Sequence, residues 1–315
     1  MSNLNLLDIA KLNGKDPVVG LIEENLTYAP EVAQFPARTI RGTSYKTAVR
    51  TALPTVEFTG ANEGVTASKS SFRDELIETY ILRSSIKVDV AVANAYEDGP
   101  EALKLIEASG VMKSALIEIG KQVWYGVTTD AKGFPGVKAF TPKGGSMTYD
   151  AAGTTATTAS SVYAVKFGPQ DTQLILGNGQ SFELGDWVQQ QVLDSNNKEY
   201  MAWTAGLTCW VGLQLANAYC VGRMCNVTAD SGKTCSDAKI AELLALFPVG
   251  HMPDALFMSR RSLRQLQASR TVVINTGPTT KATGAMELVA PAPDSAFGIP
   301  IYPTDSILNT DAIES

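Results

Sequence analysis

The longest helical pattern in the chain runs over residues 98–125. Asp98 can cap its start, and Pro100 stands near the first helical position, where a missing N–H costs little. Apolar residues recur there at spacings of three and four, which predicts one apolar stripe along the helix. The stripe consists of Leu105, Ala108, Met112, Leu116, Ile119 and Val123, widened by Leu103, Ile106 and Ile117. A helix of about 27 residues is about 40 Å long, which is typical of the support of a broad, thin molecule.

The stretch before this helix predicts a long hairpin over residues 44–84. Residues 45–58 have the pattern of a strand, and residues 60–71 are small and turn-rich. Residues 72–84 then run back along the first arm as a strand or a short helix. The apolar content is too low to bury both faces, and a lone two-stranded hairpin is marginally stable in water. We therefore expect the hairpin to rest on something outside its own fold, most simply another copy. Residues 86–92 alternate and predict a strand beside the long helix.

The chain after the helix divides into two parts by its pattern. Residues 144–161 are rich in glycine and threonine and predict a linker, and residues 162–227 predict a β-rich block. From residue 236 the pattern predicts a helix, a strand, a second helix, a loop over 276–292 and a final strand. This stretch is expected to form a compact α/β module, distinct from the β-rich block.

Residues 1–43 predict an arm with little core of its own. Short helices are expected at residues 5–12 and 17–25, after which Pro30 and Pro36 favour an extended backbone. A locally basic run then leads into the hairpin. It is either a solvated strand face or a surface that meets acidic groups of a neighbouring subunit. The candidate inter-subunit contacts are the charged residues Arg38, Arg41, Lys46, Arg50, Glu57, Glu63, Lys69 and Arg73.

Composition and charge exclude several classes of protein. Hydrophobic residues make up 44% of the 315 residues and charged residues 18%, an ordinary composition for a soluble protein. The net charge of −6 argues against a dedicated nucleic-acid binder, which needs a basic patch. No apolar run approaches the roughly 18 residues of a membrane span, and no signal peptide is evident. A cytosol-like compartment, with reduced cysteines, is expected.

No residue pattern predicts catalysis or metal binding. His251 is the single histidine and has no nucleophile motif near it, so a structural or solvent-exposed role is expected. The four cysteines lack the close pairs of a zinc site, so buried thiols are expected at Cys209, Cys220, Cys225 and Cys235. No catalytic, cofactor-binding or metal-binding residue is assigned, although a soluble α/β enzyme of hydrolase type, with an unrecognised site, remains the alternative.

Three stretches and the order of elements support a family resemblance. The stretches are FPARTIRGTSYKTAVRTALPTVEFTGANEG at residues 35–64, WYG with GFPGVKAF at residues 124–140, and PDALFMSRRSLRQLQ with FGIPIYPTDSI near the end. Together they resemble the major capsid proteins of tailed bacteriophages, which have the Hong Kong 97-type capsid fold, and most resemble those of short-tailed phages.

The resemblance implies an α+β fold with four parts. These are an N-terminal arm at residues 1–43, an E-loop hairpin at 44–84, a peripheral domain at 85–235 with its spine helix at 98–125, and an axial domain at 236–315. In the familiar order the axial helix and strand precede the closing strands of the peripheral domain. Here the β-rich block comes first, so a permuted connectivity is expected.

The resemblance also implies function and partners. The chain would self-assemble as pentamers and hexamers into an icosahedral shell around the double-stranded DNA genome, in the host bacterial cytoplasm. Expected partners are other copies, a separate scaffolding protein, the portal, cement or decoration proteins, and packaged DNA bound without sequence specificity. Neither a membrane nor a cofactor is implied. Nothing in the sequence shows a catalytic carboxylate positioned beside Lys46 or Lys69, so crosslinking between subunits is not expected.

Overall fold

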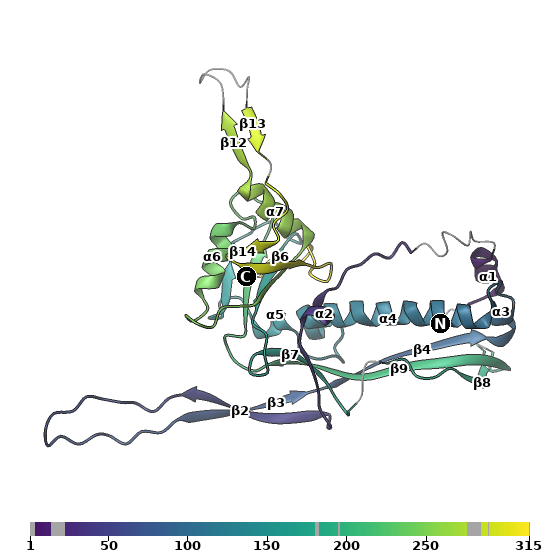
Figure 1. Ribbon diagram of the computed structural model, residues 1–315, viewed down its shortest axis with the longest axis horizontal. Helices are drawn as coiled ribbons and strands as arrows, with labels where there is room; N and C mark the ends of the chain where they lie inside the picture. Colours follow the sequence, from purple (N-terminus) through teal and green to yellow (C-terminus); the bar gives the residue numbers. More distant parts are fainter. Residues whose placement is uncertain are drawn as a thin grey trace.

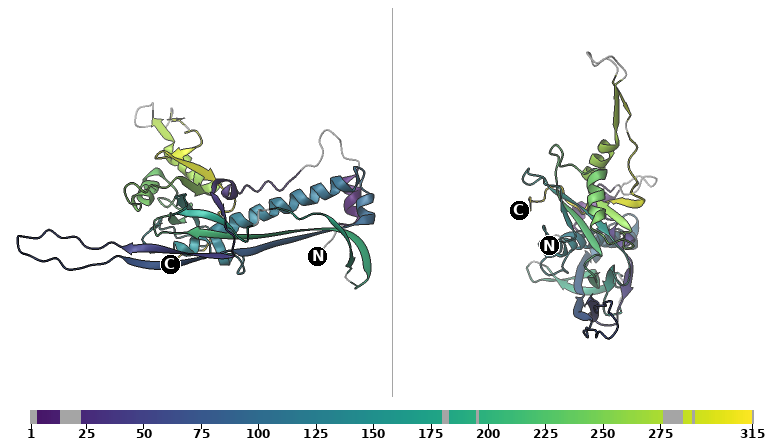
Figure 2. Two further views of the ribbon diagram at one scale, coloured as in Figure 1. Left: turned by 60° about the horizontal axis from the view of Figure 1, so that its bottom comes forward. Right: turned by 90° about the vertical axis from the view of Figure 1, so that its left-hand side faces the viewer.

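The computed structural model describes residues 4–13, 23–179, 183–194, 196–275, 285–288 and 290–314. It has a long, thin part built on one helix and a five-stranded sheet, and a compact module built on a six-stranded sheet (Figure 1). The module stands over one end of the thin part. A two-stranded hairpin continues the long axis beyond the module in both views (Figures 1 and 2).

The predicted long helix is present as α4, Gly99–Tyr125, with Pro100 in its first turn. Asp98 precedes it, but its side chain makes no capping hydrogen bond to the helix, so the expected cap is wrong. The helix ends at Gly126, whose φ of 56° favours glycine. A Cβ at this position would also collide with the backbone of Gly136, so the tight exit from the helix requires glycine here.

The predicted apolar stripe is right in one half of α4 and wrong in the other. Ile119 and Val123 are buried as expected. In the first half, Leu105 of the central stripe is 71% exposed, whereas Leu103, predicted only to widen the stripe, is fully buried. The reason is tertiary, because this half packs on α3, Val90–Asn94, and β4, Tyr80–Asp89. The face of α4 that contacts these neighbours contains Leu103, and Leu105 lies on the opposite face.

The five-stranded sheet lies along α4 (Figure 1). Its path is β1–β7–β9–β4, and β8 pairs with β9. The bounds are β1, Ala37–Thr39; β7, Thr172–Leu176; β8, Val188–Leu193; and β9, Glu199–Leu215. The strand predicted at 86–92 starts earlier, at Tyr80, and stops at Asp89. Asp89 Oδ1 accepts a hydrogen bond from Ala91 N at 2.7 Å, which starts α3 instead.

The six-stranded sheet has the order β14–β15–β11–β6–β10–β5. Its strands are β5, Thr148–Asp150; β6, Ser160–Val165; β10, Val221–Val227; β11, Ala255–Met258; β14, Ser295–Ala296; and β15, Ile299–Pro303. The predicted helices are present as α6, Asp237–Ala245, and α7, Arg260–Arg270. Alternate residues of β6 face opposite ways: Val162 and Ala164 pack with the α6–α7 side, and Tyr163 and Val165 pack toward α4.

The boundary expected at residue 236 does not separate two units. Strands β6 and β10 from the predicted β-rich block share a sheet with β11 and β15, whereas β7, β8 and β9 belong to the other sheet. The expected block at residues 162–227 is therefore divided between the two parts of the molecule. The strands of this block therefore do not support the expected permuted connectivity, which required all of them to close one domain.

The remaining elements modify the predicted arm and loops. The helix expected at 5–12 is present as α1, Leu6–Leu12, with Asn5 as its cap. Of the helix expected at 17–25, residues 17–22 lie outside the described residues and residues 23–25 are not helical. An unpredicted short helix α2, Glu31–Gln34, follows Pro30, which is its N-cap residue and has a helical backbone conformation in place of the expected extended one. The short helices η1, Gly126–Thr128, and α5, Val137–Phe140, follow α4.

Two hairpins project from the molecule. One pairs β2, Ser44–Ala52, with β3, Ser71–Glu78, and is the predicted hairpin. It ends at Glu78 and not at residue 84, because residues 80–84 belong to β4 and pair with β9. The other pairs β12, Val272–Asn275, with β13, Ala285–Leu288, and rises from the module (Figure 1). Strands β5 and β13 thus lie within predicted loops. The remainder of the loop predicted at 276–292 lies largely outside the described residues.

The two parts meet in an aromatic hub at the end of α4. Its members come from four segments far apart in the sequence: Phe35, Trp124, Tyr163 and Phe257, all buried. The ring centroid of Trp124 lies 4.7 Å from that of Tyr163 in a stacked arrangement and 5.1 Å from that of Phe257. The hub therefore joins the arm, α4 and the six-stranded sheet in one core.

Candidate assembly interface

The hairpin beyond the body exposes a series of large apolar side chains. Val56 is 94% exposed and Phe58 fully exposed. The other large apolar side chains exposed on the hairpin are Leu53, Val65, Phe72 and Leu76. Such a concentration on one projecting element is typical of a surface that another molecule covers, because monomeric proteins rarely leave it in water.

The hairpin keeps its form without a core because its two arms bind each other through polar groups. Strands β2 and β3 pair from Ser44↔Glu78 to Ala52↔Ser71. Farther out, Thr55 N donates to Ser68 Oγ at 2.9 Å, and Thr66 N donates to Glu57 Oε1 at 3.1 Å. These bonds hold the extended arms together over residues 53–70, where no strand is formed.

The base of the hairpin is fixed to the five-stranded sheet. Ile77 is buried in a small cluster with Ile40 and Ile175, and Tyr45 packs against it. The Tyr45 hydroxyl also donates to Gln214 Oε1 on β9. The hairpin thus leaves the body in a defined direction, which a surface for binding another subunit requires.

The eight charged residues predicted as inter-subunit contacts are all exposed. Two of them form exposed pairs within the hairpin, Lys46 with Asp74 at 2.6 Å and Arg73 with Glu75 at 3.1 Å. Surface pairs of this kind contribute about 0–1 kcal/mol each, so they leave these charges available to a partner.

The other six predicted residues differ in what they contact. Arg38 lies over the ring of Tyr45 and Arg50 over that of Phe72, at 5.5 and 5.6 Å from the centroids. The carboxylates of Glu57 and Glu63 accept backbone N–H groups near the tip. Arg41 and Lys69 complete the exposed set.

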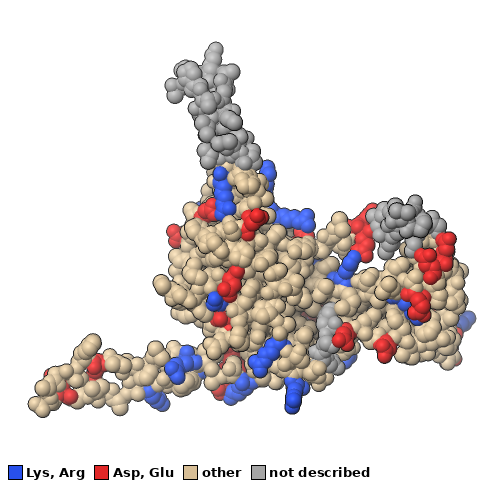
Figure 3. Space-filling view, in the orientation of Figure 1, with Lys and Arg blue, Asp and Glu red and all other residues tan. Residues whose placement is uncertain are grey.

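These charges are arranged along one projecting element rather than gathered in one cluster. Side chains of both signs lie along the hairpin (Figure 3): nearer the body Lys46 and Arg73 pair with carboxylates, and Glu57 and Glu63 lie toward the tip. The apolar hairpin residues were absent from the sequence-based set of contacts. The sequence does contain a signal for them, since Val56 and Phe58 alternate with polar residues in a stretch that has no second apolar face to cover them.

The residues tested for chemistry have structural roles in the fold. His251 Nε2 lies 3.0 Å from Asp171 Oδ1. The four cysteines are buried and unbridged, as expected. Burial raises the pKa of the Cys209, Cys220 and Cys225 thiols to about 11 and that of Cys235 to about 12. These thiols are protonated at neutral pH and are therefore poor nucleophiles.

Among the residues that the structure describes, no group of three or more His, Cys, Asp or Glu side chains could hold a metal ion. Within the same part of the chain, no helix is both long and apolar enough to cross a membrane.

Comparison with solved structures shows the fold. The structure of bacteriophage Epsilon15 matches with a TM-score of 0.76 at 18% identity, covering 100% of this chain and 98% of that one. Chains of the Mycobacterium phages Bobi and Cain match with TM-scores of 0.48 at 12% and 11% identity. These two matches cover 71% and 70% of this chain, and 98% and 97% of theirs.

Comparison at the level of sequence shows the family. No curated protein matches the chain. The family model described as "Major capsid protein GP7" matches residues 37–313, which is most of the sequence. The chain therefore belongs to the major capsid protein GP7 family, with the Hong Kong 97-type capsid fold, and is a structural, non-enzymatic subunit of an icosahedral phage capsid shell.

Proposed function

We propose that the chain assembles through its hairpin and arm, which lie on neighbouring copies within pentamers and hexamers. Residues 44–78, the paired part of the hairpin expected at 44–84, would act as the E-loop, and residues 1–43 as the N-terminal arm. The observation that carries the proposal is the fully exposed Phe58 at the end of a coreless hairpin whose base is rigidly fixed. Burial against another copy would remove this apolar surface from water, which stabilises association.

The domain division is proposed in a revised form. The five-stranded sheet with α4 is the peripheral domain, and α4 is its spine helix. The axial domain is the six-stranded module with α6 and α7, including β5, β6 and β10, and it surrounds the five-fold and six-fold axes. The sheet pairings support this division, which replaces the boundary at residue 236. A permuted connectivity is not part of the proposal.

The eight charged residues are proposed to select the register of the contact. Charges of both signs, spaced along the hairpin, let it bind a neighbour of complementary charge in one orientation. Charge complementarity of this kind contributes more to specificity and association rate than to affinity. Neutralising a single charge should therefore slow assembly without preventing it.

Further partners are proposed from the family. The shell would form in the host bacterial cytoplasm on a separate scaffolding protein and would contact the portal and cement or decoration proteins. A net charge of −6 fits a shell that encloses double-stranded DNA without binding its sequence, since tight phosphate contacts need clustered Lys and Arg.

Deletion of residues 60–71 tests the role of the hairpin. We expect a folded subunit with the thermal midpoint of the full chain, because these residues contribute nothing to the buried clusters. Negative-stain microscopy with a scaffolding protein should show no closed shells from this subunit. Normal shells from a folded, shortened subunit would refute the proposal.

A further inference from the structure

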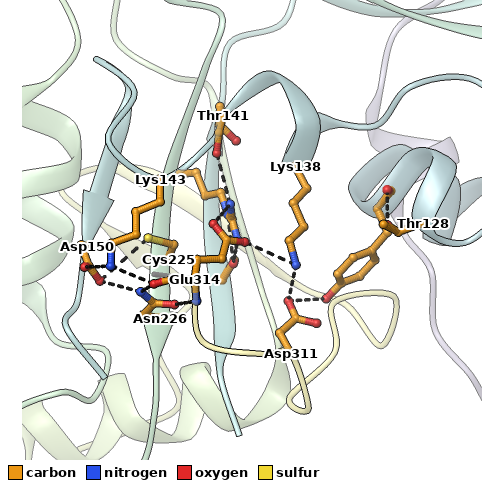
Figure 4. A network of polar contacts seen from close by, with 12 residues as sticks. Thr128, Lys138, Thr141, Lys143, Asp150, Cys225, Asn226, Asp311 and Glu314 are labelled. Carbon is orange, nitrogen blue, oxygen red and sulfur yellow. Dashed lines mark hydrogen bonds and ion pairs between the residues drawn. The ribbon is translucent and has the colours of Figure 1, made fainter. Parts of the chain in front are cut away.

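The segment that follows β15 contacts parts of the molecule that are distant from one another. From Thr304 to Glu314 it leaves the six-stranded sheet, passes the end of α4 and reaches β10. Figure 4 shows its last part, with Asp311 and Glu314. On its way it binds the arm, α4, α5 and three strands of the module. No regular helix or strand forms in it beyond a single bridge between Asp311 and Ala159, so side-chain contacts hold it in place.

The first group of contacts holds the arm. Asp305 N donates to Tyr28 O at 2.9 Å, and Tyr28 N donates to Asp305 Oδ2 at 2.9 Å. The Thr304 hydroxyl donates to the buried carboxyl of Glu31, whose Oε1 also accepts Trp124 Nε1–H at 2.6 Å. The arm is therefore bound to α4 partly through this segment.

The second group of contacts holds the end of α4. Leu308 N donates to the Tyr125 hydroxyl at 2.8 Å, and that hydroxyl donates to Asp311 Oδ2 at 3.2 Å. Lys138 on α5 lies 3.4 Å from both Asp311 Oδ2 and Glu314 Oε1. Ile307 is buried in the core that contains the aromatic hub. Polar and apolar contacts together fix the middle of the segment.

The third group of contacts is an ion pair with a buried partner. The guanidinium of Arg223 on β10 is 2% exposed and binds both carboxylate oxygens of Glu314, at 2.9 and 2.7 Å. Burial alone would raise the pKa of Glu314, but hydrogen bonding and attraction from Arg223, and then Lys138, lower it overall. Without Glu314 the buried guanidinium would keep its bonds to Ser161 and Thr141 but lose its nearest counter-ion.

The backbone of Glu314 is bound as closely as its side chain. Its N–H donates to Asn226 Oδ1 at 3.0 Å, and its carbonyl accepts Asn226 Nδ2 at 3.1 Å and Lys143 Nζ at 2.8 Å. The same region contains Asp150, which binds Lys143 and Asn226 (Figure 4). Arg223, Lys138, Asn226 and Lys143 thus all bind Glu314, which is the anchor of the far end of the segment. At the near end, Asp305 also binds Arg260 at 2.9 Å.

We propose that residues 304–314 are a clamp that fixes the arm and the six-stranded module to the end of α4, with Glu314 as its positioning residue. The clamp acts within one subunit and is separate from the hairpin contacts proposed above. The segment binds the arm at its near end and β10 at its far end, so releasing Glu314 should loosen the contacts along it, including the one between Asp305 and Tyr28. The clamp lets each subunit present its arm and module to neighbours in one relative orientation.

Hydrogen exchange on the unassembled full chain tests this proposal in a Glu314→Ala variant. We expect exchange to accelerate on the order of tenfold or more at the amides of Tyr28, Asp305 and Leu308, because their bonds open with the segment. Amides of β4 near Val88, at the far end of α4, should keep their protection. Unchanged exchange at Tyr28 and Asp305 would overturn the clamp.

A double variant separates the clamp from simple destabilisation by an unpaired charge. Arg223→Met with Glu314→Met removes the buried pair, so its thermal midpoint should return toward that of the full chain. The clamp predicts that exchange at Tyr28 stays accelerated in this variant, since the anchor is still missing. If protection at Tyr28 returns together with stability, Glu314 acts by neutralising Arg223 alone and the proposal fails.

This experiment does not depend on the hairpin. Exchange is measured before assembly, so a failure of hairpin-mediated contacts would leave its outcome unchanged. Glu314→Gln serves as the conservative variant: it keeps one acceptor oxygen for Arg223 and should accelerate exchange at Tyr28 less than Glu314→Ala. Equal acceleration by the two variants would contradict a positioning role for the carboxylate.

Discussion

The hairpin and the aromatic hub use the same residue types in opposite ways. In the hub, Trp124 and Phe257 are buried against one another and against rings from other segments. In the hairpin, Phe58 and Val56 have no neighbours to cover them. The apolar surface of the hub stabilises the subunit itself, whereas that of the hairpin can contribute only when a second molecule is present.

Charged residues follow the same division. Near the hub, Glu31 and Arg223 are buried and bound by several polar groups each. On the hairpin, Lys46 and Asp74 form a pair that is about two-thirds exposed on both sides. Substitutions near the hub should therefore change the free energy of unfolding, and substitutions on the hairpin should change assembly.

The largest expected effect is that of Trp124→Ala. It removes a fully buried side chain from the hub and also the N–H donor to Glu31, so it should lower the free energy of unfolding by about 3–5 kcal/mol. Urea denaturation of the unassembled subunit measures it. The matched control is Trp187→Ala, because Trp187 is partly exposed. An equal cost at both positions would contradict the special role of the hub.

A second comparison, at the far end of α4, concerns the orientation of the helix. Leu103→Ala should cost about 3 kcal/mol, because Leu103 is fully buried against α3 and β4. Met112→Ala should cost about 1 kcal/mol, because Met112 is partly exposed. Unfolding by urea again gives both values. A larger cost at Met112 would restore the face of α4 that the sequence pattern indicated.

That pair of positions shows how far periodicity could predict the fold. The length of α4 was predictable because its apolar pattern is long and ends at glycine. Its orientation was not, since Leu103 and Leu105 are equally apolar and α3 and β4 decide which of them is buried. The strand over residues 86–92 failed for a related reason, because the cap at Asp89 is a local hydrogen bond that alternation does not reveal.

The division into sheets could not be predicted from local pattern. Strands β6 and β7 are both nearly buried throughout, and a continuous apolar run gives no sign of its partner. Their pairing is decided by contacts with strands distant in sequence. The hairpin was predictable because low apolar content excluded a core. Its exposed aromatic residue was missed because charge was taken as the mark of a contact.

A smaller effect on stability, and one that depends on pH, is expected from Glu31, the buried carboxylic acid of the arm. Burial raises the pKa of Glu31 above its ordinary value of 4.5, despite hydrogen bonds from Thr304 and Trp124 that lower it. A raised pKa means that the folded state binds the proton more tightly. This contribution to stability is therefore present below about pH 4.5 and is lost as the pH rises through the raised pKa.

Glu31→Gln tests this sign. The amide cannot ionise, so the free energy of unfolding of the variant should not fall as the pH rises through the pKa of Glu31. At neutral pH it should be about 1 kcal/mol larger than that of the unmodified chain. Denaturation at a series of pH values measures the difference. Glu24→Gln, at an exposed position of the same arm, should leave the pH dependence unchanged. A variant that is less stable than the full chain at neutral pH would show that the carboxylate itself holds the arm.

The smallest effect on stability and the largest on assembly should come from Phe58→Ser. The ring is fully exposed in the subunit, so its loss should change the free energy of unfolding by no more than about 0.5 kcal/mol. If the ring is buried against another copy, the same change should sharply reduce shell formation, as seen by sedimentation and negative-stain microscopy. Val249→Ser is the matched control, since Val249 is fully exposed but lies outside the hairpin. Equal losses of assembly from the two variants would mean that exposed apolar area anywhere promotes association, and the distinction between hairpin and hub would then concern folding alone.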